Sequence, residues 1–359
     1  MNQHFVPQFY FRQFTGGDPR IQLLLKAESR IIHNASIKGQ CARHGFYGSD
    51  EIERFFSQLE KRHSKVLNNI IELAWTPRSN EVAVELFDWM WEAILFQRAR
   101  TQLQINKLSP AWEALYLEMF KRYVEHSNDI DIKVPLLEHI ECGNFRLIHD
   151  PIASTLMQIS TLLESTLLIS DLDFRILRNQ TDSPFIFSDS PVVFHNTYCQ
   201  NVTTRGVLGL QCPGLQIFWP LNNHTLLFLL DPEVYSMRPD MGLVIDICQR
   251  SDISQLNALQ LHHSLRATYF SYTAASEYVS DLWFAHKRSI VEPRYSFNPS
   301  KRCLVLGEVV DDLLHLFEPQ INIVLDLSFV HCVPVRASDF RFRHRSPDLV
   351  AEHRNHPRC

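Results

Sequence analysis

Apolar residues in the first half of the chain recur at steps of three and four, which is the period of an amphipathic α-helix. One such stripe begins after Asp50, which we expect to be the N-cap with Glu53 three residues later, and it stops at Pro77. The same period predicts helices over residues 81–106, 110–126, 133–142 and 151–169. Residues 1–172 are therefore expected to be mostly helical.

From residue 173 the pattern changes to short runs of β-branched and aromatic residues separated by turn residues, which is typical of strands. Strands are predicted at residues 174–177, 184–187, 191–195, 215–219, 226–230 and 268–272, and within 321–330. Helices are predicted at residues 251–265 and 274–286. Because helices and strands are segregated along the chain, we predict an α+β fold. A helical N-terminal half packs on a mixed or antiparallel sheet, with additional helices in the C-terminal half.

These patterns divide the chain into a helical half (1–172), a sheet-bearing half (173–335) and a basic tail (336–359). The two halves are expected to pack as one unit. The tail holds six Arg and three His against three acidic residues. Two interpretations of it stay open: a solvated, flexible terminus, as charged chain ends commonly are, or a phosphate-binding segment.

Composition narrows the function by exclusion. Hydrophobic residues make up 45% of the chain and charged residues 21%, which is typical of a globular protein and not of a disordered one. The net charge of −5 gives no general attraction for nucleic acid, so such binding would need a local patch. The chain has only 11 Gly and neither a Gly-x-Gly-x-x-Gly loop nor a Walker-type loop, which argues against nucleotide kinases and Rossmann enzymes.

Cysteine usage and apolar run lengths bear on the compartment. The 8 Cys are dispersed without a Cys-x-x-Cys pair, so we expect reduced thiols rather than a zinc ribbon. The start of the chain lacks the apolar run of a secretory signal, and no apolar run reaches the roughly 20 residues that span a bilayer. We therefore expect a cytoplasmic protein with no membrane partner.

Several motifs of the chain can be compared with known families. Residues 2–14 read Asn-Gln-His-Phe-Val-Pro-Gln-Phe-Tyr-Phe-Arg-Gln-Phe, and residues 184–192 read Pro-Phe-Ile-Phe-Ser-Asp-Ser-Pro-Val. Other matched motifs are Phe46-Tyr47, Leu59-Glu60, the segment 97–101 (Gln-Arg-Ala-Arg-Thr), Pro220-Leu221 and Asn257. Together these motifs resemble a large, mainly bacterial family, domain of unknown function 4238, from residue 2 to about residue 272. Phe11 stands where that family usually has Leu, and the resemblance brings no established activity with it.

Four polar residues of these motifs lie on separate predicted elements: His4, Glu60, Arg100 and Asp189. We expect them to converge in one cleft and to form a catalytic centre for phosphodiester hydrolysis. Glu60 and Asp189 would hold a divalent cation such as magnesium. His4 would move a proton, and Arg100 would bind phosphate by its planar fork. The side chains expected to contact the ligand beside them are Gln8, Gln97, Thr101 and Ser188.

Each residue of this set also has a structural interpretation. His4 could hold a hydrogen-bond network that pins the N-terminal segment. Glu60 and Arg100 could form a buried ion pair between helices, since a partly buried charge needs a partner whatever its function. Asp189 could belong to an Asx-type turn at a strand end.

Three functions therefore stay open. The first is a metal-assisted hydrolase of phosphodiesters, such as a nuclease in bacterial defence or stress response, whose partner is nucleic acid. The second is a non-catalytic sensor that binds a small anionic ligand through Arg100, Gln97 and Gln8. The third is a structural or interaction protein whose shared motifs only hold the fold. Metal dependence separates the first from the second, because a site built on Arg and amides keeps its ligand when metal is chelated.

Overall fold

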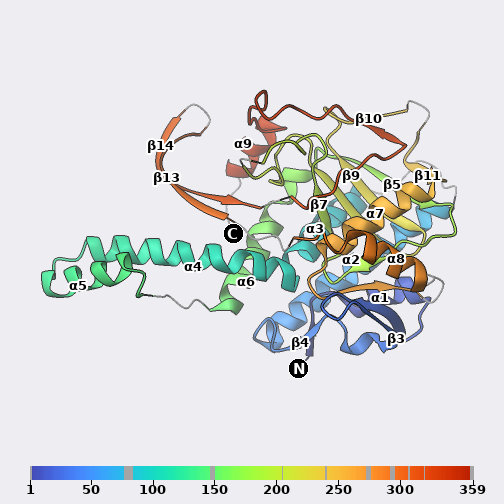
Figure 1. Ribbon diagram of the computed structural model, residues 1–359, viewed down its shortest axis with the longest axis horizontal. Helices are drawn as coiled ribbons and strands as arrows, with labels where there is room; N and C mark the ends of the chain where they lie inside the picture. Colours follow the sequence, from blue (N-terminus) through green and yellow to red (C-terminus); the bar gives the residue numbers. More distant parts are fainter. Residues whose placement is uncertain are drawn as a thin grey trace.

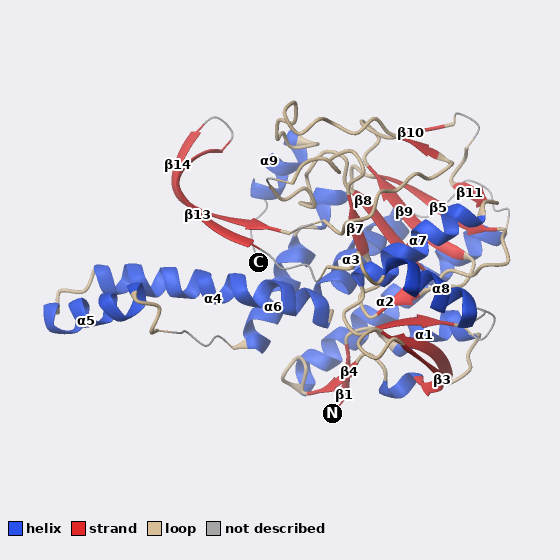
Figure 2. Cartoon of the chain, in the orientation of Figure 1, coloured by secondary structure: helices blue, strands red, loops and turns tan. Residues whose placement is uncertain are grey.

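The computed structural model describes residues 2–76, 84–145, 150–203, 205–238, 241–271, 276–291, 296–305, 308–318 and 320–355, with side chains except at 84–87 and 296–317. Figure 1 shows a body of sheets and helices from which a long helical hairpin projects at one side. Strands gather inside the body and helices lie around them (Figure 2). The fold is α+β, as predicted from the sequence.

The first fifty residues form short strands and one helix. These elements are β1 (Asn2–His4), α1 (Gln8–Thr15), β2 (Arg20–Leu25), β3 (Arg30–Ser36), the 3-10 turn η1 (Ile37–Gly39) and β4 (Ala42–His44). Strand β1 pairs antiparallel with β4, and β2 pairs antiparallel with β3. Helix α1 ends because Gly16 takes a φ of 62°, the left-handed conformation that commonly stops a helix.

Helices then dominate the chain to residue 169. They are α2 (Asp50–Trp75), α3 (Val84–Ala99), α4 (Gln102–Glu125), α5 (Ile130–Glu141), α6 (Pro151–Glu164) and the 3-10 turn η2 (Thr166–Ile169). The N-cap of α2 is Ser49 and not Asp50, since the Ser49 side chain accepts a hydrogen bond from Ile52 N at 3.3 Å. Asp50 is instead the first helical residue, where a carboxylate still favours the helix dipole.

The predicted helix over residues 81–106 is interrupted at Thr101. The Thr101 hydroxyl accepts a hydrogen bond from Gln104 N at 3.4 Å and so begins a new helix, α4. Helix α4 then continues through Pro110, at which the sequence pattern predicted a separate helix to start. Apolar periodicity could not show this break, because both sides of the break keep buried residues.

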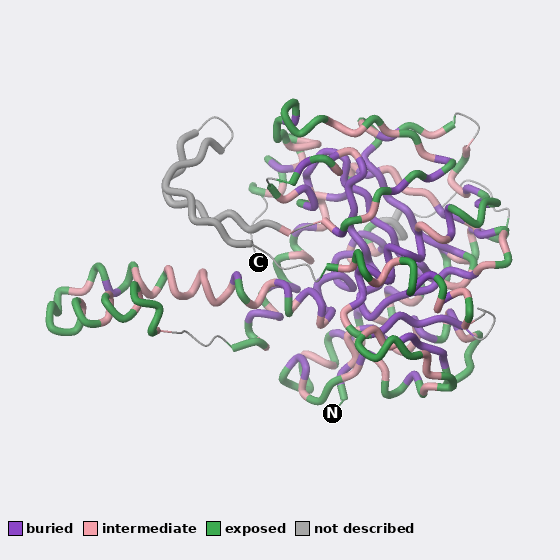
Figure 3. Tube along the Cα trace, in the orientation of Figure 1, coloured by how far each residue is buried: buried purple, intermediate pink, exposed green. Residues whose placement is uncertain are grey.

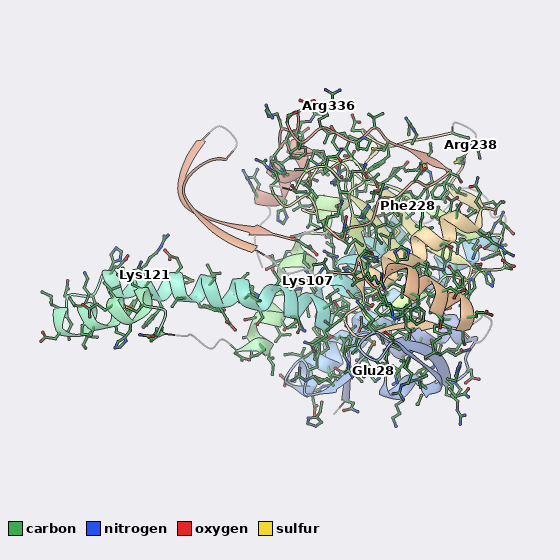
Figure 4. The ribbon with its side chains drawn as sticks, viewed as in Figure 1. Glu28, Lys107, Lys121, Phe228, Arg238 and Arg336 are labelled. Atoms are coloured by element: carbon green, nitrogen blue, oxygen red, sulfur yellow. The ribbon has the colours of Figure 1, made fainter. Side chains whose placement is uncertain are left out.

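A five-stranded sheet forms the centre of the body, in the order β11-β5-β9-β8-β7. Its strands are β5 (Asp173–Asn179), β7 (Val193–His195), β8 (Gln216–Pro220), β9 (Thr225–Leu230) and β11 (Val244–Ile247). Neighbouring strands are antiparallel except β11 and β5, which are parallel. Every residue of β8 and β9 is buried, including Phe228 at the middle of the body in Figure 4.

A four-stranded sheet, in the order β3-β2-β12-β6, joins the start of the chain to its second half through β6 (Phe187–Ser188) and β12 (Ala267–Phe270). The rings of Tyr10, Phe11 and Phe14 lie with their centroids 5.1, 5.1 and 4.3 Å from that of Phe187. Helices α7 (Arg250–His263) and α8 (Ser276–His286) contribute to a core cluster with residues of β2 and β12. The two halves of the chain therefore share one sheet and one core.

The remaining elements lie at the periphery. They are β10 (Ser236–Met237), which pairs with β15 (Val330–His331), the hairpin β13 (Ser296–Val305) and β14 (Glu308–Phe317), and α9 (Pro347–Asn355). The α4–α5 hairpin extends away from the body, and most of its outer residues are exposed or half-buried (Figure 3). Among the described residues, no helix is both long enough and apolar enough to cross a membrane.

Residues 336–355, for which a flexible terminus was one of the two interpretations of the sequence, contact the body. Arg345 is the main anchor, because its Nε and Nη2 atoms each donate to one carboxylate oxygen of Asp171 at 2.7 Å. Phe340 is buried in the core, and Val335 N donates to Tyr198 O at 2.8 Å. The composition of the tail could not show this contact with the body, because it does not reveal that Arg345 has a partner in Asp171. Residues 356–359 lie outside the described part of the chain.

Candidate functional site

The N-terminal signature separates into a buried face and a polar face. The buried side chains are Val6, Tyr10, Phe11 and Phe14. On the other side, His4 and Gln8 are half-buried and Arg12 is exposed. Arg12 Nη2 donates to Gln8 Oε1 at 3.3 Å, and Gln8 Nε2 lies 3.4 Å from His4 Nε2. We call these three residues the polar row. Their polar groups lie outside the buried face of α1, so they do not take part in the packing of the core.

The His4 ring is fixed at one nitrogen. Its Nε2 atom lies 3.1 Å from Lys38 O, and a carbonyl oxygen only accepts, so we assign the hydrogen of the neutral ring to Nε2. The Nδ1 atom then carries the lone pair. Burial lowers the pKa of His4 below its ordinary value of 6.5, although the hydrogen bond to Lys38 and the charge of Glu60 oppose this shift. The ring is therefore neutral at pH 7 and can accept a proton at Nδ1.

Arg100 is buried beneath this row, with 1% of its surface exposed. Its Nη1 donates to Glu60 Oε1 at 2.7 Å, its Nε donates to Tyr47 Oη at 3.0 Å, and its Nη2 donates to the backbone oxygen of His4. The guanidinium also lies 4.7 Å from the centroid of the Phe96 ring. Arg100 therefore joins α3 to α2 and β1 and positions His4, and each of its three nitrogen atoms already has a partner within the chain.

Glu53 and Tyr47 also belong to this cluster, although neither is among the site residues predicted from the sequence. Glu53 lies two helical turns before Glu60 on α2, and its Oε2 atom is buried without a hydrogen-bond partner among the described residues. Burial, followed by the charge of Glu60, raises the pKa of Glu53. The seven-residue spacing of the two Glu, and the matched Phe46-Tyr47 motif, were the signals that could have found these residues.

Gln97 and Thr101 were expected to contact a ligand, and the structure places both in contacts within the chain. Gln97 Nε2 donates to Phe5 O at 2.9 Å, so Gln97 and Arg100 hold two successive backbone carbonyls of the N-terminal segment. Thr101 is fully buried, and its hydroxyl lies 3.1 Å from Ser190 Oγ as well as capping α4.

Asp189 belongs to a different hydrogen-bond network. Its carboxylate accepts hydrogen bonds from the backbone N–H groups of Leu265, Arg266 and Ala267 at 2.7, 2.7 and 3.2 Å, and only 5% of the residue is exposed. Burial raises the pKa of Asp189, and the three N–H donors oppose that shift. Asp189 therefore fixes the turn between α7 and β12, a structural role close to the turn interpretation of its motif.

Ser188 strengthens the same junction. Its N–H and its hydroxyl both donate to Gln260 Oε1 at 3.0 Å, and Gln260 Nε2 donates to Pro191 O at 3.0 Å. Of the four residues expected in one cleft, the structure thus joins His4, Glu60 and Arg100, whereas none of these three is among the hydrogen-bond partners found for Asp189.

The expected cation ligands, Glu60 and Asp189, can be tested by their donor atoms. Glu60 Oε1 is paired with Arg100, and the two oxygens of Asp189 accept three N–H groups. Within the described ranges there is no group of three or more His, Cys, Asp or Glu placed to hold a metal ion. The residues present at these two positions therefore do not fit a shared divalent cation.

Comparison with known proteins agrees with the motifs. No curated protein and no solved structure matches the chain. The model of a family described as "Protein of unknown function (DUF4238)" matches residues 2–273, more than half of the chain. The matched range includes the polar row, Arg100 with its partners Glu60 and Tyr47, and Asp189 with the turn at residues 265–267. The chain belongs to this family of proteins of unknown function.

Proposed function

We propose that the protein is a hydrolase of phosphodiesters whose general base is His4 and whose phosphate contacts are Gln8 and Arg12. The observation that carries the proposal is the state of the His4 ring. It is half-buried, its lowered pKa keeps it neutral, and the contact with Lys38 O leaves Nδ1 as the basic atom. A base of this kind is efficient near neutral pH, because most of it is unprotonated before the reaction.

The neighbouring residues have separate roles in this scheme. Because His4 Nε2 carries a hydrogen, the amide N–H of Gln8 cannot donate to it and is left for another acceptor, such as a phosphate oxygen. Arg12 supplies an exposed guanidinium four residues further along the row. Glu60 favours the protonated His4 ring through its charge, so it would stabilise the imidazolium formed when Nδ1 takes a proton from the attacking water. The water oxygen bonds to phosphorus as the P–O bond to the leaving group breaks, and the imidazolium then returns its proton to the leaving oxygen. Arg100 acts as a positioning residue through the backbone of His4.

This scheme differs from metal-assisted hydrolysis at Glu60 and Asp189. The donor atoms of those two residues do not fit a shared cation, and no step of this scheme uses a metal. The proposal therefore predicts that a chelator leaves turnover unchanged.

The test is turnover of a fluorogenic oligonucleotide and of a small aryl phosphodiester by four proteins: wild type, His4→Gln, Arg12→Gln and the control His44→Gln. His44 is exposed on β4, the strand paired with β1. Removing the base should lower kcat by roughly 10²- to 10⁴-fold, which is the usual contribution of general acid–base catalysis. Arg12→Gln should mainly raise KM, and His44→Gln should match the wild type. No turnover by the wild type, or equal turnover by His4→Gln, would overturn the proposal.

The sensor function has one observation in its favour. The polar row offers the exposed guanidinium of Arg12 and the half-buried amide group of Gln8, and donors of this kind can bind an anion without any reaction. Arg100 and Gln97, the other contacts expected for a sensor, donate to Glu60, Tyr47 and the backbone of the N-terminal segment. Binding of phosphate-bearing ligands that Arg12→Gln weakens, without turnover by the wild type, would favour this second function.

A further inference from the structure

A second polar surface lies in the C-terminal segment. Residues 333–345 contain four Arg and one Asp, and Arg336, Arg341 and Arg343 are exposed. Arg336 points outward at the upper edge of the body in Figure 4. Arg205, an exposed residue of a separate segment, places its guanidinium 5.8 Å from the centroid of the Phe340 ring. We call these four exposed Arg and Phe342 the basic strip.

The basic strip is anchored to the body by the buried side chain of Arg345. Arg345, at its end, has only 3% of its side chain exposed and is paired with Asp171. The same guanidinium donates to the backbone oxygens of Leu168, Leu210 and Cys212 at 3.2, 3.0 and 3.2 Å. A strip with a fixed backbone loses less conformational entropy when it binds than a free tail would.

An exposed aromatic ring lies among these charges. Phe342 is 48% exposed, although it follows Arg341 and precedes Arg343 in a segment without helix or strand. Its ring centroid is 5.2 Å from that of His344, and the two planes are 82° apart, so the two rings pack edge to face. An accessible ring between cations matches the two needs of a single nucleic-acid strand, which are a stacking platform for a base and positive charge for the phosphates.

We infer that the basic strip binds single-stranded nucleic acid, with phosphates at the Arg residues and one base stacked on Phe342. The local charge is needed because the whole chain carries −5. In Figure 1 the red segment that precedes α9 runs along the upper edge of the body, and the N-terminus lies at the lower edge. The strip is therefore a surface apart from His4. The inference does not depend on the proposed hydrolase.

The test measures fluorescence anisotropy of a labelled single-stranded oligonucleotide, and of the same sequence as a duplex, over a range of salt concentrations. The first variant is Arg336→Gln combined with Arg343→Gln. Arg341 is kept because it donates to Ser338 O and Phe340 O and so supports the local turn. The slope of log K against log salt should become shallower by about 1.4, because each phosphate contact on a single strand contributes about 0.7.

The second variant, Phe342→Ala, removes the stacking platform. It should weaken binding of the single strand roughly tenfold, as loss of one base-stacking ring does, and leave duplex binding unchanged. Arg30→Gln is the matched control, since Arg30 is exposed on β3 at the other edge of the body. It removes the same charge and should leave both affinities as in the wild type. Thermal melts show whether each variant is folded.

Two results would overturn the inference: no binding of the wild type to the single strand at low salt, or the same affinity and slope in the double Arg variant. The competing partner for the basic strip is a second copy of the chain. Its α4–α5 hairpin is acidic, because residues 112–142 carry seven acidic against three basic side chains. If the strip variants change the sedimentation coefficient but not nucleic-acid binding, the strip is a contact between copies and the inference fails. The hydrolase proposal fails on turnover alone, which the binding assay does not measure, so failure of either proposal is seen separately.

Discussion

The buried side chain of Asp189 accepts hydrogen bonds from three backbone N–H groups through its two carboxylate oxygens. Asp189→Asn replaces one acceptor oxygen by an NH2 group that faces a backbone N–H. We expect the free energy of unfolding to fall by about 1–3 kcal/mol, the cost of leaving a buried donor unpaired. Any turnover measured per folded molecule should stay as in the wild type. Denaturant titration measures the first quantity, and Asp326→Asn at an exposed position is the control. A large loss of turnover at full stability would instead show that Asp189 takes part in the chemistry.

The residues of the candidate site could be predicted only in part from the sequence, because a motif does not show which atoms its polar side chains contact. His4, Glu60 and Arg100 were found because they lie within recognisable motifs, and the structure joins them through direct hydrogen bonds to Arg100. Asp189 lies in an equally clear motif, yet its partners are backbone N–H groups of residues 265–267, which leave no signal in the sequence. A motif shows that a polar side chain matters but not whether it faces a ligand or the backbone.

At the scale of elements, Thr101 decides where one long helical pattern divides into α3 and α4. Its hydroxyl caps α4 and contacts Ser190 Oγ. Thr101→Ala should lower the free energy of unfolding by about 1–2 kcal/mol, as the loss of an N-cap hydroxyl does. Thr101→Ser keeps the hydroxyl and should retain most of the stability in the same denaturant titration. Equal losses in both variants would show that packing of the methyl group, and not the cap, is what matters.

The periodic patterns predicted most helices, because an amphipathic stripe is a local property of the sequence. Sheet order was not predictable in that way. Strand β12 lies between β2 and β6, so residues 267–270 pair on one side with residues 22–25, more than two hundred positions earlier in the chain, and on the other side with residues 187–188. The parallel pairing of β11 with β5, and the wholly buried β8 and β9, also depend on which helices cover the sheet. Such long-range choices follow from tertiary packing, to which a single sequence gives little access.

At the scale of the whole molecule, buried His residues couple folding to pH. Burial lowers the pKa of His195 to about 3 and that of His262 to about 4, and it lowers the pKa of His263 well below 6.5. Each of these rings is harder to protonate in the folded state than in the unfolded chain. Below pH 6.5 the unfolded state therefore binds more protons, and the free energy of unfolding falls as the pH decreases.

His195 offers the clearest test, because neither of its ring nitrogens has a hydrogen-bond partner among the described residues. Between pH 8 and pH 5 its contribution to the free energy of unfolding should fall by about 2 kcal/mol, since each unit of pKa difference is worth about 1.4 kcal/mol. In His195→Leu, denaturant titrations at the two pH values should differ by that much less than in the wild type. The matched control replaces the exposed His331 by Gln. If His195→Leu retained the full pH dependence, the coupling would have to reside in other groups, with His262 and His263 on α7 the next to replace.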